Sequence, residues 1–160
     1  MTDPLATYLQ DHLSGAAFAV ELVATLRDQH HGEPLGDFAA ALLPELQADQ
    51  ETLQRLADRV GVGSGGVREV AAWLGEKASR LKLGRGAANA LGPFEALETL
   101  ALGIQGKLGL WRALEVVTPV NPQLKGTNFD HLAARALSQY AQVEERRLEA
   151  ARAALGPPAN

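Results

Sequence analysis

The sequence predicts an all-α protein built as a bundle of four long helices. Three observations lead to this fold class. Apolar residues recur at the three- and four-residue spacing of amphipathic helices, proline and glycine interrupt that pattern at only a few places, and no segment alternates as a half-buried strand does. A chain of 160 residues with 46% hydrophobic content can form one domain with a substantial core. We therefore expect residues 1–160 to form a single helical domain.

Proline and glycine delimit the first two helices. The first carries Pro4 in its first turn and is expected to extend over residues 4–31. The second is expected over residues 34–60, with Gly61 at its C-terminal end. Pro44 lies inside this second helix and removes one backbone hydrogen bond, so we expect a kink or a break there.

The other two long helices follow a long connection. Residues 61–92 begin with a glycine-rich run and carry a short predicted helix at about 67–83. The third long helix is expected over residues 93–118 and the fourth over 127–155, followed by a short tail at 156–160. The third and fourth helices are separated by only a short, proline-containing segment.

The lengths of these connections predict how the helices are arranged. Each helix is about 40 Å long at a rise of about 1.5 Å per residue, so the helices have to pack side by side. Short connections make the first and second helices antiparallel, and likewise the third and fourth. The connection at 61–92 is long enough to cross the bundle from end to end. The expected order is up-down-down-up, with a short extra helix in the crossover.

Several polar residues occupy core-facing positions. Asp49 falls in the middle of the apolar stripe of the second helix. On the fourth helix Glu144 and Arg147, three residues apart, lie within the apolar face, whereas Arg135 is expected to point away from it. Because an unpaired buried ion is strongly destabilising, we expect the inward charges to form one network. The expected members of this buried polar cluster are Asp49, Glu144, Arg147, Tyr140 and His12.

The short, long and short connections, together with Glu144-x-x-Arg147, resemble the ferritin-like superfamily. As a topology, the resemblance covers nearly the whole chain. Di-iron members carry a Glu on each of two helices and Glu-x-x-His on each of the other two. The ligands that the resemblance implies for iron or manganese are Glu21, Asp49, Glu98 and Glu144. In this chain Arg147 stands where a ligating imidazole is expected, and a guanidinium cannot bind a metal. We therefore expect no di-metal centre, with Arg147 supplying the positive charge instead.

Two classes of function follow from this resemblance, and a third remains open. The first is a metal-free ferritin-like bundle without a cofactor, acting as an interaction or stress-associated protein and forming a homodimer. The alternative is a di-metal carboxylate protein that handles iron, oxygen or peroxide. A small-ligand-binding bundle is the third class, and it requires an interior cavity that a sequence does not reveal.

Glycine recurs every three residues on the third helix, at Gly103, Gly106 and Gly109. Each internal glycine costs roughly 1 kcal/mol relative to alanine, so a compensating contact is expected. We expect a smooth groove into which another helix packs closely, either the crossover segment or a second subunit. The crossover is the favoured partner, because it has to pack against something. Trp73 and Trp111 are expected to be packing anchors whose indole N–H groups need acceptors.

Composition and charge exclude several other classes. A net charge of −4 gives no general attraction to phosphate or anionic lipid, so nucleic acid is not an expected partner. The chain contains no cysteine, which excludes thiolate nucleophiles and cysteine-ligated metals. There is no apolar stretch of about 20 residues and no signal-peptide pattern at residues 1–5, so we expect a cytoplasmic protein that does not associate with membranes. No catalytic constellation is recognisable.

Overall fold

The computed structural model describes residues 3–62 and 91–157, and within them it contains four long helices and no strand. The helices are α1 (Pro4–Gln29), α2 (Pro34–Val60), α4 (Leu91–Val117) and α5 (Phe129–Leu155), with two short 3-10 helices, η1 (Thr118–Val120) and η2 (Pro122–Leu124), between α4 and α5. The all-α class is confirmed, and each helix begins and ends close to its predicted bounds. The short helix predicted at about 67–83 lies outside the described residues.

Capping residues set the helix ends. Asp3 caps α1, because its Oδ1 accepts a hydrogen bond from the Leu5 backbone N–H at 2.9 Å. Gly61 ends α2 at φ 85°, a left-handed conformation that glycine adopts without strain. The Asn128 side chain accepts a bond from the backbone N–H of His131 at 3.0 Å and caps α5. Local chemistry therefore accounts for the ends of these helices.

Pro44 does not divide α2. The helix is continuous from Pro34 to Val60, and Pro44 lies on its exposed side. Leu43 and Leu46, on either side of the proline, are both buried. Their packing holds the two halves of the helix in place although one backbone hydrogen bond is missing. Of the two outcomes expected at Pro44, a kink or a break, the break is not observed.

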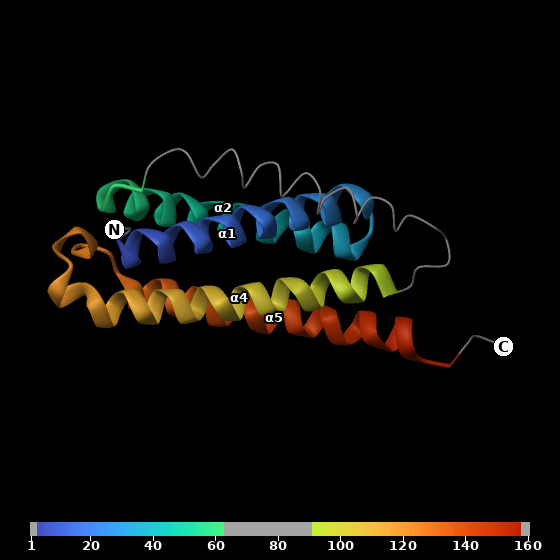
Figure 1. Ribbon diagram of the computed structural model, residues 1–160. Helices are drawn as coiled ribbons and strands as arrows, with labels where there is room; N and C mark the ends of the chain where they lie inside the picture. The colour runs from blue at the N-terminus through green and yellow to red at the C-terminus, as the bar shows by residue number, and fades with distance from the viewer. Residues whose placement is uncertain (1–2, 63–90, 158–160) are drawn as a thin grey trace.

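The four helices form two hairpins. α1 packs along α2 and α4 packs along α5, with a smaller interface between the two pairs. In Figure 1, α2 and α4 run in one direction, and α1 and α5 run in the other. None of the described helices combines the length and the apolar character needed to cross a membrane.

One apolar core connects the two hairpins. Its fully buried members come from every long helix, and they include Leu9, Val23, Leu56, Leu97, Ile104, Trp111 and Val143. Among the described residues, Asp49 and Gln139 are the buried polar side chains within this core. They mark the place where the interior departs from simple apolar packing.

Candidate functional site: a buried ion network and an adjacent pocket

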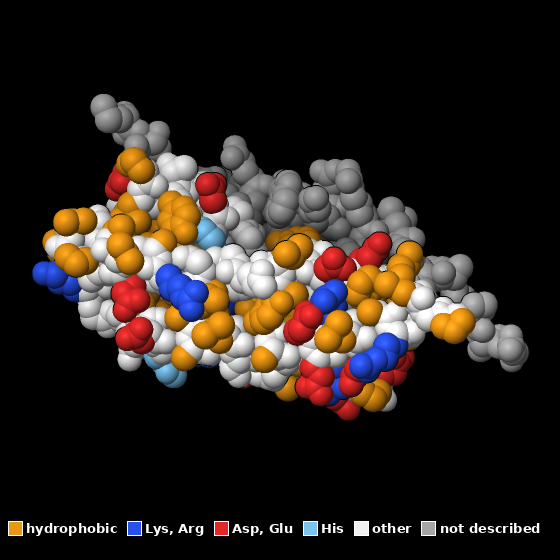
Figure 2. Space-filling model, turned by 90° about the horizontal axis from the view of Figure 1, so that it is seen from below, with side chains coloured by type: hydrophobic (Ala, Val, Ile, Leu, Met, Phe, Trp, Pro, Cys, Tyr) orange, Lys and Arg blue, Asp and Glu red, His pale blue; other side chains and the backbone are white. Residues whose placement is uncertain are grey.

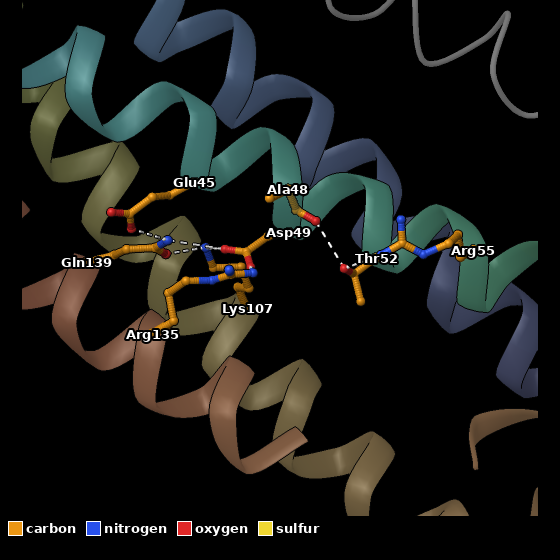
Figure 3. A network of polar contacts seen from close by, with 8 residues as sticks. All are labelled: Glu45, Ala48, Asp49, Thr52, Arg55, Lys107, Arg135 and Gln139. Atoms are coloured by element: carbon orange, nitrogen blue, oxygen red, sulfur yellow. Dashed lines mark hydrogen bonds and ion pairs between the residues drawn. The ribbon is translucent and has the colours of Figure 1, made fainter. Parts of the chain in front are cut away.

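Asp49 on α2 lies at the centre of a polar network inside the bundle (Figure 3). It is 3% exposed, and it faces Lys107 on α4 and Arg135 on α5. The Lys107 Nζ donates to Asp49 Oδ2 at 2.6 Å, and the Arg135 Nη2 donates to Asp49 Oδ1. The buried carboxylate is therefore paired with two cations, which is the condition for holding a charge in an interior at tolerable cost.

Gln139 and Glu45 complete this network. The Gln139 side chain is fully buried; its Nε2 donates to Glu45 Oε2 at 3.0 Å, and its Oε1 accepts a bond from Lys107 Nζ. A further bond runs from Gln139 Nε2 to Asp49 Oδ2 at 3.3 Å. Asp49 pairs with both Lys107 and Arg135, and Glu45 joins them through Gln139, so the two carboxylates and two cations of the network carry no net formal charge. It ties α2 of one hairpin to α4 and α5 of the other.

The charged state of Lys107 depends on this network. Burial lowers the pKa of its ammonium group below the usual value, while the nearby Asp49 carboxylate acts to raise it. The side chain is 14% exposed, so little solvent is available to stabilise the charge. Without Asp49, the ammonium would lose its main counter-charge.

The five residues of the predicted polar cluster lie in two separate places. Asp49 and His12 line a pocket beside the ion network. Glu144, Arg147 and Tyr140 line a smaller hollow of about 200 Å³ between α4 and α5. The prediction of a single network is therefore wrong, although both groups consist of residues from the predicted set.

The Glu144–Arg147 pair differs from the Asp49 network in its exposure. Arg147 donates two bonds to Glu144, from Nε and Nη2, each at 2.7 Å. The Glu144 side chain is 27% exposed, and the Arg147 side chain is 23% exposed. The hydrogen bonds from Arg147 hold the pKa of Glu144 below its ordinary value.

The cation that reaches Asp49 from α5 is Arg135, which was predicted to point outward. Arg135 points inward because of the rotation of α5 about its own axis. This rotation places Gln139, and not Tyr140, on the buried side of the helix.

The four candidate metal ligands are not brought together. Glu21 is exposed on α1, and Asp49 is held by the ion network. Glu98 and Glu144 border the α4–α5 hollow, where Arg147 already pairs with Glu144. Within residues 3–62 and 91–157, no three His, Asp or Glu side chains are grouped so that they could hold a metal ion.

A pocket of about 350 Å³ lies beside the ion network, between α1, α2 and α4. Small residues on two facing helices form much of its wall: Gly15, Ala16 and Ala19 on α1, and Gly103 and Gly106 on α4. A Cβ atom added at any of these three glycines would have no heavy atom within 4 Å, and the same is true of Gly109. Among the described residues, no helix packs closely on these glycines. The crossover segment, which is the favoured partner in the prediction, lies outside the described residues, so this prediction stays untested.

His12, Trp111 and Lys107 are among the residues that line this pocket. Burial lowers the pKa of His12, although the neighbouring Asp11 acts to raise it, so the imidazole is neutral at pH 7. Trp111 is fully buried, and its indole N–H has no acceptor in the described part of the chain. The predicted role of Trp111 as a buried anchor is confirmed, but no acceptor for its N–H is found in the described part of the chain. Trp73 lies outside the described residues.

Lys107 and Gln139 lie outside the predicted site. Gln139 continues a series of buried positions at spacings of three and four residues, namely Phe129, Leu132, Ala136, Gln139 and Val143. That series is the signal that identifies Gln139 as an inward polar residue. Lys107 has no comparable signal, because apolar residues surround α4 on nearly all sides and leave its inward face undefined.

Comparison of this chain with protein-family models, with curated proteins and with solved structures gave no match. The function is therefore argued from the geometry and chemistry of the described residues.

Proposed function

We propose that this chain is a ferritin-like, up-down-down-up bundle without a di-metal centre, which acts as a cytoplasmic interaction or stress-associated protein. The observation that carries this proposal is the pairing of Asp49 with Lys107 and Arg135 in the bundle interior. The directions of the four long helices, together with their short, long and short connections, support the ferritin-like part (Figure 1).

The interior charge balance favours a protein without a metal. A di-metal centre needs an excess of inward carboxylates, because each divalent cation brings two positive charges. In this bundle Glu45 and Asp49 are already balanced by Lys107 and Arg135. A cation bound at Asp49 would have to displace these two side chains and leave their charges unpaired in a poorly solvated place. The fixed cations therefore fill the electrostatic role that a metal would have.

The proposal also includes a homodimer formed through the α4–α5 face. Within the described residues, every large hydrophobic side chain that is exposed belongs to α4, η1 or α5. These side chains are Leu91, Leu102, Val116, Val120, Leu137, Leu148 and Leu155. Figure 2 shows the molecule from below, where hydrophobic side chains gather between charged ones. The α1–α2 hairpin has no such exposed side chain in its described part.

The exposed residues of α4 and α5 form two stripes. At about 100° per residue, the three on α4 fall within about 40° of one another, and the three on α5 within about 20°. Leu102 borders the same hollow as Glu144, which lies on the α5 stripe between Leu137 and Leu148, so the two stripes meet. A second copy related by a two-fold axis would bury both stripes. The Glu144–Arg147 pair supplies both signs of charge, so two such faces do not repel each other.

Metal content tests the proposal. Protein purified after growth with iron and manganese is expected to contain no stoichiometric metal, and its melting temperature is expected not to rise when either metal is added. Near-stoichiometric metal that is lost in Glu144→Ala or Asp49→Asn, and retained in the neighbouring control Glu145→Ala, would contradict it. That result would favour the alternative, a di-metal carboxylate protein handling iron, oxygen or peroxide.

A further inference from the structure

We infer that the proposed homodimer is antiparallel: its two-fold axis crosses the middle of the α4–α5 face, so that α4 packs on α4 of the second copy and α5 packs on α5. This inference rests on the proposed homodimer and goes beyond it, because it specifies which residues of the two copies meet. It is carried by the spacing of the charged and the exposed apolar side chains along the two helices.

The charged residues beside the apolar stripe of α4 make this stripe complementary to a reversed copy of itself. Glu95 and Arg112 are exposed and lie on either side of the stripe, each within about 60° of its centre at about 100° per residue. Glu95 is eight residues before Gly103. Arg112 is eight residues after Ile104. A point between Gly103 and Ile104, the axis position of α4, is therefore equally far from both charges. A two-fold axis at this position brings each Glu95 level with Arg112 of the second copy.

The two ends of the α4 stripe follow the same rule. Leu91 and Val116 are its exposed apolar end residues, and they are equally far from the axis position of α4, so they also meet across the interface. A parallel arrangement of the two α4 helices would instead place Glu95 against Glu95 and Arg112 against Arg112, and like charges that face each other across an interface are unfavourable. No ion pair within the described residues involves Glu95 or Arg112, so both can pair with a second copy.

The exposed leucines of α5 define an axis position of their own. Leu137 is five residues before Gln142. Leu148 is five residues after Val143. A point between Gln142 and Val143 therefore lies midway between the two leucines. A two-fold axis there brings Leu137 of one copy level with Leu148 of the other and buries both side chains.

The two axis positions coincide in the fold. Lys107 on α4 donates a hydrogen bond to Gln139 on α5, and both residues are equally far along the chain from the axis position of their own helix. Leu102 and Glu144 border the hollow between the two helices, and they are likewise equally far from it on the other side. Because α4 and α5 are antiparallel (Figure 1), the two axis positions lie at the same height in the bundle. One two-fold axis therefore serves both helices.

A two-fold axis parallel to the helices is the competing arrangement, and it would place α4 of one copy on α5 of the other. Residues that are level within one chain would then face each other across the interface. Leu102 would face Glu144. Leu148 would face Glu98, which is level with it on α4. Both contacts would set a carboxylate against a leucine. The antiparallel arrangement avoids this mismatch at Leu148, because it places Leu148 on Leu137.

A charge exchange tests the contact between Glu95 and Arg112. Glu95→Arg and Arg112→Glu are each expected to raise the dissociation constant of the dimer about tenfold, because each places like charges across the interface. The doubly substituted protein is expected to dimerise more tightly than either single variant, because opposite charges face each other again. Effects of the two substitutions that simply multiply would show that these side chains do not meet.

Single cysteines test the position of the axis, because the chain contains none of its own. Leu102→Cys lies beside the axis and is expected to form a covalent dimer under mild oxidation, since its two copies are displaced by only about 4.5 Å along the helix. Leu137→Cys and Leu148→Cys are each displaced from their own equivalents by roughly 16 Å. Neither is expected to cross-link alone, whereas an equimolar mixture that is exchanged under reducing conditions and then oxidised is expected to give the heterodimer. Ala40→Cys, on the exposed side of α2, is the control and is expected to remain uncross-linked.

Sedimentation of the same cysteine variants under reducing conditions separates this inference from the homodimer on which it rests. A Leu137→Cys dimer that cross-links with itself, or a dimeric mixture that gives no heterodimer, would overturn the antiparallel axis and leave the homodimer standing. Monomeric variants together with a monomeric unsubstituted protein would contradict both.

Discussion

Two ion pairs of similar chemistry occupy different environments in this bundle. Asp49 is 3% exposed, and its partner Arg135 approaches it from another hairpin. Glu144 is 27% exposed, and its partner Arg147 is one turn away on the same helix. Solvent screens the second pair and can rehydrate either member when the other is removed, so such pairs contribute little to stability. The first pair has no such compensation, because its carboxylate is enclosed by the core.

Replacing each arginine by methionine tests this difference. Arg135 and Arg147 are both on α5 and are similarly exposed, at 26% and 23%. Arg135→Met is expected to lower the free energy of unfolding by about 2 kcal/mol, because Asp49 then retains Lys107 as its one cation. Arg147→Met is expected to cause a clearly smaller loss. Urea denaturation measures both, and an equal or larger loss for Arg147→Met would contradict the assignment of the interior network.

At this scale the sequence predicts which residue needs a partner better than it predicts the partner. The burial of Asp49 follows from its place in the α2 stripe and is confirmed. Its contact with Arg135 does not follow, because helical periodicity assigns a side chain to a sector of its helix but does not set the rotation of one helix against another. A rotation of roughly one residue on α5 exchanges Gln139 for Tyr140 on the buried side.

At the scale of the helices, α4 is weakened by its own composition. Gly103, Gly106 and Gly109 lie in the middle of the helix, and none of them makes room for a close neighbour in the described structure. Gly36 in the first turn of α2 is different, because a Cβ there would lie 2.0 Å from the carbonyl oxygen of His30. The close approach of the His30 backbone therefore requires glycine at position 36. No described residue imposes such a requirement at the three glycines of α4.

Alanine substitutions distinguish these two kinds of glycine. Gly109→Ala is expected to raise the free energy of unfolding by about 1 kcal/mol, because alanine has the higher helix propensity and its Cβ meets nothing. Gly36→Ala is expected to lower it, because the backbone has to shift to relieve the clash with His30. Chemical denaturation of both variants provides the measurement. A destabilising Gly109→Ala would show that another part of the molecule, or a second subunit, packs on this face of α4.

The four long helices themselves are predictable from the sequence for a local reason. Pro34, Gly61 and the glycine-rich start of the crossover interrupt the apolar periodicity, and the observed helices begin and end near these positions. The pocket is not predictable in this way, because glycine spacing is the same whether a helix packs on it or open space lies there. Whether a pocket forms there depends on how closely α1 and α4 approach each other in the folded chain, which the sequence pattern does not specify.

At the scale of the whole molecule, the two hairpins are joined by the apolar core and by the polar network around Asp49. The exposed apolar stripes of α4 and α5 lie on the outer face of the second hairpin. Such an uneven distribution is typical of a protein that uses one face for association. The network acts within the chain, whereas the stripes are the face that we propose for association between copies.

The proposed dimer is tested by its mass. The 17.0 kDa chain is expected to sediment at twice this mass. The double variant Leu102→Glu with Leu148→Glu is expected to sediment as a monomer, because each copy would bring two charges into the apolar interface. Ala40→Glu with Ala41→Glu, on the exposed side of α2, serves as the control and is expected to remain a dimer. A monomeric parent protein, or a control that dissociates equally, would argue against the α4–α5 face as the interface.

The central claim is that Asp49 and Lys107 form a stabilising pair across the two hairpins, and a double-mutant cycle measures it directly. Asp49→Asn and Lys107→Met are introduced singly and together, and the free energy of unfolding is determined for all four proteins. The two substitutions are expected to be non-additive, with a favourable coupling of about 2 kcal/mol between the native side chains. A coupling near zero would contradict this claim, because it would mean that the two charges do not act on each other in the folded protein.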